Sequence, residues 1–520
     1  MPQDLPGLYF DADKNRYFPI RGPIPGSARN SSSAASNTAP SSSTANASNS
    51  VSKPNLSNNS SRRIKIKAAK LLQDRELYGN VITSRKGKCN FQEEYHKMQA
   101  SQPLVWKYNE TERIADGALE EAHIGVHTPD GLIETDLLLA GSTNGSLSLY
   151  EVSKVAQLFH SGIEHAPDCV WPLTSETQGF VEEPIRLWRT PIASIHLSSN
   201  VSCIKMFGKY LDTHGSASQH VLITTLGSET SGGSVHVLNL REPIDYILGA
   251  SLLRLRIYNV ATSNCTVWTA DCNSDGSQAV VGTNLGASLI NLETGAKSWV
   301  FRCKSDAMAV QLHGQVVLCG LRNGAIVTVD TRQRSDGRSD RLTRHRISHQ
   351  SHEIPKSSRT PQNSSKQWFE LKGNILHSHI ISMPSSISCL ASLQMYDQYF
   401  LASSMDGSIR LYDHRIIQRG PVQCYEGNVN THTRIQLAVD PDERILMSGG
   451  EDCKIRLWSI KSGHLLFEEK FMNTVPSTMC RRMQPPTVAR DNCRYYSYGQ
   501  DLGLGCWVGS REGIFCMRWL

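Results

Sequence analysis

A short unit of apolar strands around a tight turn recurs along this 520-residue chain. Its clearest copy runs from Ile387 to Arg415, where Asp406-Gly407 separates two apolar runs and the second run ends in Tyr412-Asp413. Asp-Gly between alternating strands is a strong hairpin signal. Three such short strands make most of one blade of a β-propeller, in which small sheets surround a central channel.

The other copies have turns near residues 145, 233, 286, 324, 453 and 513, which with the first makes seven units. The gaps between them are irregular and indicate loop insertions. In the last copy we expect the strand before the turn at Arg494–Gly499. Seven blades close a ring and leave no long free sheet edge. We therefore predict an all-β fold, a seven-bladed β-propeller over residues 102–520, behind a disordered and partly helical N-terminal extension.

The extension divides by composition into three parts. Residues 1–26 contain the aromatic pairs Tyr9-Phe10 and Tyr17-Phe18 around a polar turn, which predicts a hairpin. That hairpin either docks on the main domain or binds a partner. Residues 27–61 are almost entirely Ser, Asn, Ala, Thr and Pro. We predict disorder there, because too few apolar side chains are available to offset the entropy of ordering.

Residues 62–101 are basic at first and then helical in pattern. The segment Arg62–Leu72 predicts a basic helix, which is also compatible with a nuclear import signal or a nucleic-acid contact. Further on, Phe91, Tyr95 and Met98 lie on one face of a helix. This apolar stripe either packs on the propeller or docks on a partner, and the sequence leaves both open.

Charge and cysteine content limit the class of protein. The formal net charge is +6, which is only mildly basic, and no apolar run is long enough for a membrane span. The N-terminus carries no secretory pattern. The fourteen cysteines include no Cys-x-x-Cys pair, so we expect reduced core residues in a nuclear or cytoplasmic protein.

No catalytic or metal-binding motif is present. The chain contains no phosphate-binding loop, no His-Glu-x-x-His and no Gly-x-Ser-x-Gly sequence. The longest insertion, residues 331–366, is rich in Arg and Ser and predicts a mobile surface loop. It contains His345, His349 and His352. We expect no metal site there, because this spacing aligns histidines only on a helix, and a segment with so many Arg, Ser, Pro and Gly residues is not expected to form one. We expect a non-catalytic protein without cofactors; a propeller hydrolase, with carboxylates or histidines in the channel, is the least favoured alternative.

Two neighbouring units end alike, in Val329-Asp330-Thr331-Arg332 and in Tyr412-Asp413-His414-Arg415. The pattern places Arg332 and Arg415 in the turn after the third strand, on one flat face of the ring. Each arginine can pair with the aspartate of its own blade, or remain solvated. Alternatively, the two guanidinium groups make bidentate contacts with acidic or carbonyl groups of a partner.

The Asp-x-Arg ending resembles the DWD box of WD-repeat substrate receptors of cullin-4 ubiquitin ligases. Two further segments resemble the cullin-4-associated factor 4 family: Leu5–Asp11 with Arg16-Tyr17-Phe18, and Tyr425–Asn430. The boxes depart from the family pattern, because Val329 and Tyr412 stand where tryptophan is preferred.

The resemblance implies a site and a function. It assigns contact with the adaptor, damaged-DNA-binding protein 1, to the two boxes and to the helical stripe; these residues are Asp330, Arg332, Tyr412, Asp413, Arg415, Phe91, Tyr95 and Met98. Arg415 is the stronger candidate and Arg332 the second. The implied function is a non-catalytic receptor that joins the adaptor, and through it cullin-4, to an unidentified protein that is ubiquitinated. The alternative is a WD-repeat scaffold of an RNA-processing or ribosome-assembly complex, with residues 62–88 and 331–366 as nucleic-acid arms.

Overall fold

The structure is a computed structural model of the whole chain. It describes residues 8–11, 16–19, 68–79, 81–84, 87–129, 131–154, 156, 158, 162–172, 184–189, 194–208, 219–228, 230–240, 244–245, 256–332, 343–346, 368–372, 380–481 and 505–519. The chain forms two compact units, residues 1–62 and 63–520. The predicted disordered segment, residues 27–61, lies outside the described residues.

The first unit contains one antiparallel hairpin. Strands β1 (Leu8–Asp11) and β2 (Arg16–Pro19) pair so that Tyr9 lies opposite Phe18 and Phe10 opposite Tyr17. The hairpin predicted from the two aromatic pairs is therefore confirmed.

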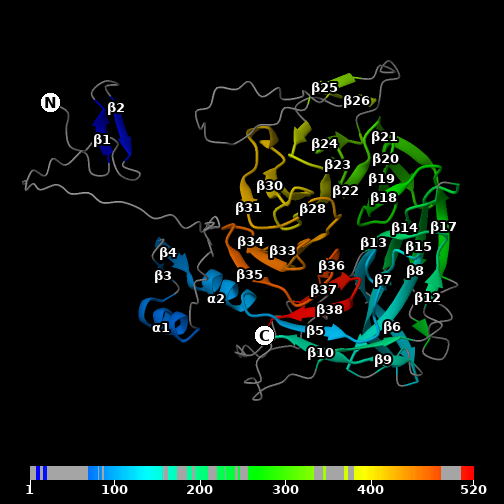
Figure 1. Cartoon of the computed structure of the whole chain (residues 1–520), viewed down its shortest axis with the longest axis horizontal. Helices are drawn as coiled ribbons and strands as arrows, with labels where there is room; N and C mark the ends of the chain where they lie inside the picture. The colour runs from blue at the N-terminus through cyan, green and yellow to red at the C-terminus, as the bar shows by residue number, and fades with distance from the viewer. Residues whose placement is uncertain are drawn as a thin grey trace, which may run out of the picture. The chain divides into compact units, whose positions relative to one another are not determined.

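The second unit is a seven-bladed β-propeller, as predicted, with the blades arranged around a central channel (Figure 1). From the channel outward, blade 1 contains β6 (Ala118–Thr128), β7 (Gly131–Gly141), β8 (Ser146–Ser153) and β11 (Arg186–Arg189). Blade 2 contains β13 (Val201–Phe207), β14 (His220–Thr225), β15 (Ser234–Asn239) and β17 (Ile257–Thr262). Blade 3 contains β18 (Val267–Cys272), β19 (Gln278–Thr283), β20 (Gly286–Asn291) and β21 (Lys297–Cys303). Blade 4 contains β22 (Ala307–His313), β23 (Val316–Leu321), β24 (Ala325–Asp330) and β27 (Ile380–Ser382). Blade 5 contains β28 (Ile387–Ser392), β29 (Tyr399–Ser404), β30 (Ile409–Asp413) and β31 (Gln423–Tyr425). Blade 6 contains β32 (Leu437–Val439), β33 (Ile445–Gly449), β34 (Ile455–Ser459) and β35 (Leu465–Glu469).

Blade 7 closes the ring by joining the two ends of the propeller. It contains β36 (Thr478–Arg481), β37 (Gly505–Ser510), β38 (Gly513–Arg518) and, from the other end of the domain, β5 (Leu104–Tyr108) and β10 (Pro167–Trp171). The strand before the last turn is thus β37, and the prediction of Arg494–Gly499 for that strand was wrong; residues 482–504 lie outside the described part of the chain.

Additional strands extend blade 1 at its edges. They are β9 (Ile163–His165), β12 (Ser194–His196) and β16 (Ile244–Asp245), which pair with β11, β8 and β6 respectively. Strands β6 and β7 have eleven residues each, whereas the inner strands of the other blades have at most seven.

The core lies between the blades. Each pair of neighbouring blades shares a cluster of buried apolar side chains, such as Phe400 and Tyr412 of blade 5 with Leu318 and Ile326 of blade 4. The tight turns between second and third strands require glycine at the closest approaches. Gly407 has φ +84°, and a Cβ atom there would lie 2.5 Å from the carbonyl oxygen of Asn428.

The basic insertion is not only a loop. Strands β25 (Thr343–Arg346) and β26 (Trp368–Lys372) pair with each other, and β26 adds to the outer edge of blade 3 beside β21. The prediction of a mobile surface loop over residues 331–366 did not include strand β25. The reason is that β21 offers an open strand edge and the buried Leu371 anchors β26 in the core between blades 3 and 4. His349 and His352 lie outside the described residues.

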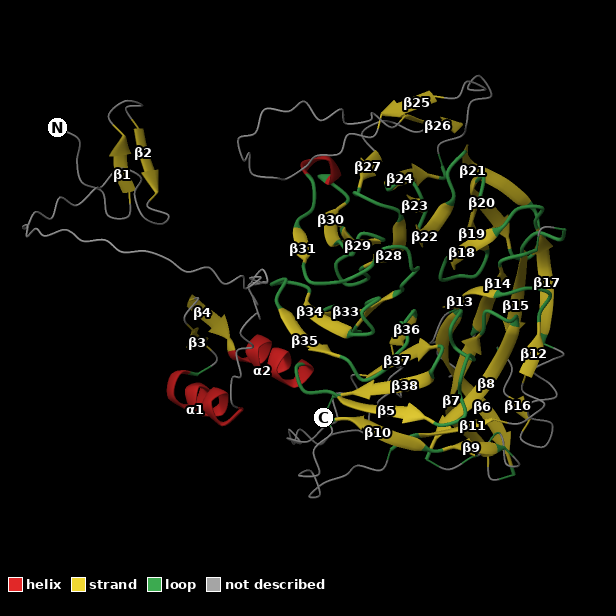
Figure 2. Ribbon diagram, viewed as in Figure 1, coloured by secondary structure: helices red, strands yellow, loops and turns green. Residues whose placement is uncertain are grey.

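Two helices precede the propeller (Figure 2). They are α1 (Ala68–Tyr78) and α2 (Phe91–Ala100), joined by the hairpin of β3 (Val81–Ser84) and β4 (Gly87–Asn90). Helix α2 begins where the side chain of Asn90 accepts a hydrogen bond from the backbone N–H of Gln92 at 3.0 Å. Neither helix is long and apolar enough to cross a membrane, and the structure describes no other α-helix.

Candidate functional site

Arg415 is held by the aspartate of its own box and is still exposed. The carboxylate of Asp413 accepts the backbone N–H of Arg415 at 2.8 Å, and the guanidinium donates from Nε at 3.1 Å and from Nη2 at 2.8 Å. The side chain of Asp413 is 5% exposed, whereas that of Arg415 is 69% exposed. Pairing within the blade and presentation to solvent therefore occur together.

The box of blade 4 repeats this geometry with less burial. Asp330 accepts the backbone N–H of Arg332 at 3.0 Å and the Nη2 group at 2.7 Å. Its side chain is 22% exposed, and Arg332 is 70% exposed. The hydrogen bonds from Arg332 lower the pKa of Asp330 to about 2, and those from Arg415 likewise lower the pKa of Asp413.

Burial of Tyr412 explains why the blade 5 box is the better anchored of the two. The Tyr412 ring stacks on Phe400 with centroids 5.4 Å apart and is nearly inaccessible to solvent. Val329, at the same position in blade 4, is only partly buried. Tyr412 thus supports the turn from within the core and does not itself face a partner.

Blade 6 carries a cation at the position of Arg415. Aligning Asp406–Arg415 on Asp452–Lys461 places Lys461 there, with Ser459 in place of Asp413. Lys461 instead pairs with Glu93 of α2, at 2.5 Å between Nζ and Oε1. Arg332, Arg415 and Lys461 therefore form a row on three consecutive blades.

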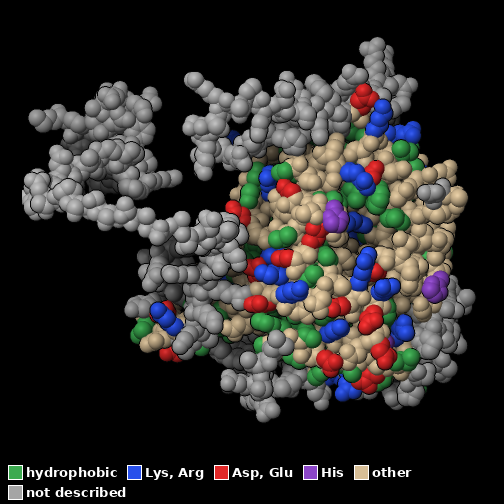
Figure 3. All heavy atoms as spheres, in the orientation of Figure 1, with side chains coloured by type: hydrophobic (Ala, Val, Ile, Leu, Met, Phe, Trp, Pro, Cys, Tyr) green, Lys and Arg blue, Asp and Glu red, His purple; other side chains and the backbone are tan. Residues whose placement is uncertain are grey.

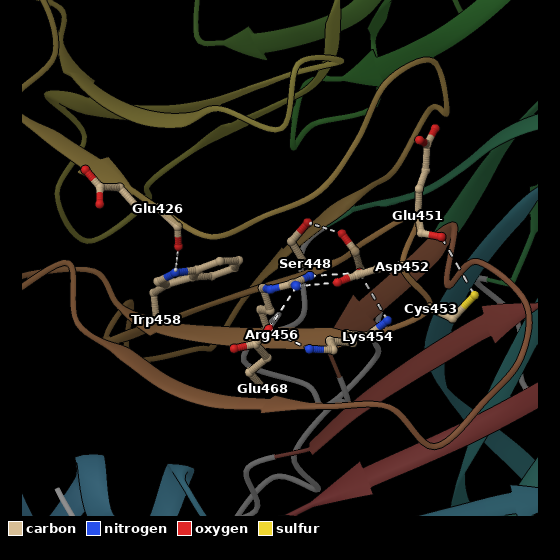
Figure 4. A network of polar contacts seen from close by, with 10 residues as sticks. Glu426, Ser448, Glu451, Asp452, Cys453, Lys454, Arg456, Trp458 and Glu468 are labelled. Carbon is tan, nitrogen blue, oxygen red and sulfur yellow. Dashed lines mark hydrogen bonds and ion pairs between the residues drawn. The ribbon is translucent and has the colours of Figure 1, made fainter. Parts of the chain in front are cut away.

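An ionic network around the buried Arg456 fixes the strand that leads to Lys461 (Figure 4). Arg456 is only 3% exposed; its Nη1 donates to Asp452 at 3.0 Å and its Nη2 to Glu468 at 3.0 Å. Trp458 Nε1 donates to the carbonyl oxygen of Glu426 in the preceding blade at 3.0 Å. Blade 6 is thereby tied to blade 5.

The predicted stripe of α2 packs on α1. Phe91 is buried against Leu71 of α1, with Tyr95 and Met98 partly buried at the same cluster. The Arg75 guanidinium lies 5.0 Å from the centre of the Phe91 ring. The sequence had offered the propeller or a partner for this stripe, and the structure gives α1 instead. Phe91 is therefore not available for direct contact.

Helix α2 is fastened to the propeller by its other side chains and its C-terminal end. Besides the ion pair of Glu93, the helix is held by Ala100, which is fully buried in the cluster between blades 6 and 7. The carbonyl oxygen of Ala100 accepts a hydrogen bond from Trp519 Nε1 at 2.9 Å. His96 lies near Asp442 and Arg444, in the loop between the first two strands of blade 6. Because first and third strands of a blade run in the same direction, this loop shares a face with the row of cations.

Exposed apolar side chains lie on the same face of blade 5. Met395 and Tyr396, between β28 and β29, and Ile416, next to Arg415, are all exposed large apolar residues. Glu443 of blade 6 fixes their loop, since its carboxylate accepts the backbone N–H groups of Met395 at 3.0 Å and Tyr396 at 3.1 Å. Tyr396 also lies near Lys461.

We call the set Met395, Tyr396, Arg415, Ile416 and Lys461 the blade 5/6 patch. It combines apolar groups with exposed cations on rigid turns, a combination suited to a protein partner with acidic or carbonyl acceptors. By contrast, Figure 3 shows Lys/Arg and Asp/Glu side chains interspersed over the visible face of the propeller, without an extended patch of one sign.

The two boxes can be recognised in the sequence, whereas Lys461, Met395, Tyr396 and Ile416 were not predicted. Alignment of the blades with one another would have found Lys461, which was overlooked because no aspartate precedes it. The three apolar residues carry no sequence signal, because exposure depends on how the loop between β28 and β29 folds.

Comparisons with known proteins agree with the resemblance. The family model of the DDB1- and CUL4-associated factor 4 beta-propeller domain matches residues 366–490. DDB1- and CUL4-associated factor 4-like protein 2 of Homo sapiens is 29% identical over 139 residues, which cover 25% of this chain and 31% of that protein. DDB1- and CUL4-associated factor 4 of Homo sapiens is 29% identical over 191 residues, 36% of this chain and 29% of that protein. The same factor of Bos taurus is 36% identical over 92 residues, 17% of each chain.

The predicted resemblance to this family is thereby confirmed. The matched regions span less than a third of the length of each relative. The part matched by the family model contains Arg415, Lys461 and the apolar residues of the blade 5/6 patch, whereas Arg332 lies before it.

Proposed function

We propose that this chain is a non-catalytic substrate receptor that docks on the adaptor DDB1 of a CUL4 ubiquitin ligase and presents a protein for ubiquitination. The observation that carries the proposal is the row of Arg332, Arg415 and Lys461 beside exposed apolar side chains, on one face of the propeller. Relatives that match part of this chain are named for association with DDB1 and CUL4.

The geometry supports docking by preorganisation. Arg415 is oriented by Asp413 before any partner arrives, so less side-chain entropy is lost on binding. Arginine at a rigid turn next to exposed aromatic and aliphatic groups is the usual composition of a binding hot spot. Helices α1 and α2 would then act as one unit at the margin of this face, since the apolar stripe of α2 is used to hold α1.

The chain would position the substrate and would not catalyse the ubiquitin transfer itself. Holding a substrate on one surface while the ligase brings a ubiquitin carrier to it raises the effective concentration of the reacting groups. All bond-making would occur in other subunits, in the nucleus or the cytoplasm.

The test is binding of purified DDB1 to the full chain and to single variants. We expect Arg415→Ala to weaken binding by at least about 10-fold and Arg332→Ala by less, because its box is less firmly anchored. Arg186→Ala is the matched control, since Arg186 is an exposed arginine paired with Glu164 on the outer strand of blade 1. Its effect on binding should be small.

Failure of the wild-type chain to bind DDB1 would overturn the proposal. Equal weakening by Arg415→Ala and Arg186→Ala would show instead that binding depends on net charge and not on this face. RNA binding with a steep salt dependence, together with absent DDB1 binding, would favour the scaffold alternative.

A further inference from the structure

A cavity of about 480 Å³ lies at the mouth of the central channel on the face opposite the row of cations. It is formed by the turns between second and third strands and by the entries to the inner strands, which lie at the other end of each blade from Arg415. Its walls include Trp268, Met308, Arg322, Met405 and Arg434, together with one carboxylate, Asp116. Apolar and cationic groups from several blades therefore converge on one cavity.

Arg434 spans this mouth from blade 6 to the far side. Its Nη1 donates to the carbonyl oxygen of Ser202 in blade 2 at 3.0 Å and to that of Trp268 in blade 3 at 2.6 Å. Its Nε is buried and makes no hydrogen bond within the described structure. No carboxylate among the described residues forms an ion pair with it, unlike Arg322, which pairs with Asp306 at 2.9 Å.

The segment that carries Arg434 is held in place by Glu451, from the turn after β33. The Glu451 carboxylate accepts the N–H groups of His432 at 3.1 Å and Thr433 at 2.9 Å, and the hydroxyl of Thr433 at 2.6 Å. These hydrogen bonds outweigh the effect of burial and lower the pKa of Glu451 to about 2, so its carboxylate is ionised at any ordinary pH. Arg434 is thus positioned by a fixed loop.

Charges deeper in the channel balance one another. Glu120, Lys205 and Asp271, on the inner strands of blades 1 to 3, interact electrostatically, and Arg481 of blade 7 also acts on Glu120. Two carboxylates therefore face two cations there. At the mouth, Arg434 forms no ion pair with any carboxylate of the described residues, and the Asp116 carboxylate in the cavity wall accepts hydrogen bonds from Ser142 and Thr143 instead. A partly enclosed guanidinium without a counter-charge favours a ligand that supplies one.

We propose that the mouth cavity binds a carboxylate of an acidic peptide segment, with Arg434 as the main contact, Arg322 as the second cation, and Trp268, Met308 and Met405 against the apolar part of the segment. The assignment of this peptide to the protein presented for ubiquitination rests on the proposed function. The carboxylate site itself does not depend on that function.

The test is fluorescence polarisation with the full chain and three labelled peptides of equal length. One contains four glutamates and an amidated C-terminus, one contains glutamines and a free C-terminal carboxylate, and one contains glutamines and an amidated C-terminus. The first two distinguish a side-chain carboxylate from a terminal one. We expect at least one of them to bind at least about 10-fold more tightly than the neutral peptide.

The Arg434→Gln variant should lose this preference, and Arg186→Gln, with the same change in net charge, should keep it. Thermal unfolding of both variants checks the fold; if Arg434→Gln is unfolded, Arg322→Gln carries the test, because Arg322 is largely exposed. Equal binding of all three peptides, or equal losses in the Arg434 and Arg186 variants, would overturn the proposal and leave Arg434 as a staple between blades.

Binding of DDB1 by the same variants separates the two proposals. Arg434→Gln should bind DDB1 as wild type does, since the cavity and the blade 5/6 patch lie on opposite faces. Peptide binding without DDB1 binding would overturn the receptor function alone. DDB1 binding without any carboxylate preference would overturn the cavity alone.

Discussion

At the scale of single residues, the central point is that Asp413 and Arg415 work as a pair. The aspartate is buried and accepts three hydrogen bonds from Arg415, which leaves the exposed guanidinium in one orientation. The sequence suggested that the arginine serves either its own blade or a partner. The structure shows that pairing with Asp413 holds the guanidinium of Arg415 exposed in one orientation, as contact with a partner would require.

This pairing predicts an effect for a variant that leaves the arginine intact. Asp413→Asn removes the charge that orients Arg415, so we expect DDB1 binding to weaken several-fold, by less than in Arg415→Ala. The matched control is Asp442→Asn, an exposed aspartate on the same face. Binding measured by biolayer interferometry should change little in the control. Equal effects of the two variants would contradict an orienting role.

The pH dependence follows from the same pair. Because the hydrogen bonds from Arg415 lower the pKa of Asp413, the native state favours the ionised carboxylate. The stabilisation is present above the ordinary aspartate pKa of 3.8 and is lost only as the pH falls through the lower native value. We therefore expect the contribution of Arg415 to DDB1 binding, measured as the wild-type to Arg415→Ala ratio, to be constant between about pH 5 and 8.

At the scale of elements, α2 shows what periodicity can and cannot predict. Phe91, Tyr95 and Met98 were correctly assigned to one helical face, because their spacing alone defines that face. What covers the face depends on α1, in which five of eleven residues are charged or amide residues and the only deeply buried side chain among the described residues is Leu71. A single leucine carries too little signal to predict the pairing.

The neighbouring leucines of α1 provide a test of that pairing. Leu71 is 2% exposed and Leu72 is 43% exposed. Leu71→Ala should cost about 2 kcal/mol or more of local stability, because it empties the contact with Phe91. We expect faster amide hydrogen exchange in α1, by at least about 10-fold, with little change in the blades. Leu72→Ala should leave exchange unchanged, and equal exchange in the two variants would show that α1 and α2 do not form a stable pair.

The blades show the same division between local and long-range information. All seven turns could be predicted, because the glycines and aspartates that form them are local signals. Strands β25 and β26 were missed because they are stabilised by the free edge of β21, which no local pattern reveals. The mouth cavity was also beyond prediction, since Arg434 reaches carbonyl groups more than 160 residues away in the chain.

At the scale of the whole molecule, stability depends on closure of the ring by β5. This strand pairs with β38, with Trp106 opposite Cys516 and Lys107 opposite Phe515. It therefore covers the edge that blade 7 would otherwise expose. The same segment of chain leads directly from α2, so the helical unit and the closing strand are fixed at one place.

Trp106→Ala is accordingly expected to destabilise the entire propeller. Trp106 is 6% exposed with Arg518 at 5.9 Å from its ring, and truncation of a buried tryptophan costs about 3–5 kcal/mol. In a domain of this size that corresponds to a fall in Tm on the order of 5 °C by calorimetry. Trp299→Ala is the control, because Trp299 on β21 is 43% exposed and should shift Tm little. If Trp106→Ala instead produced a separate early transition while the main one stayed in place, β5 would be a detachable cover, and the ring would be stable without closure.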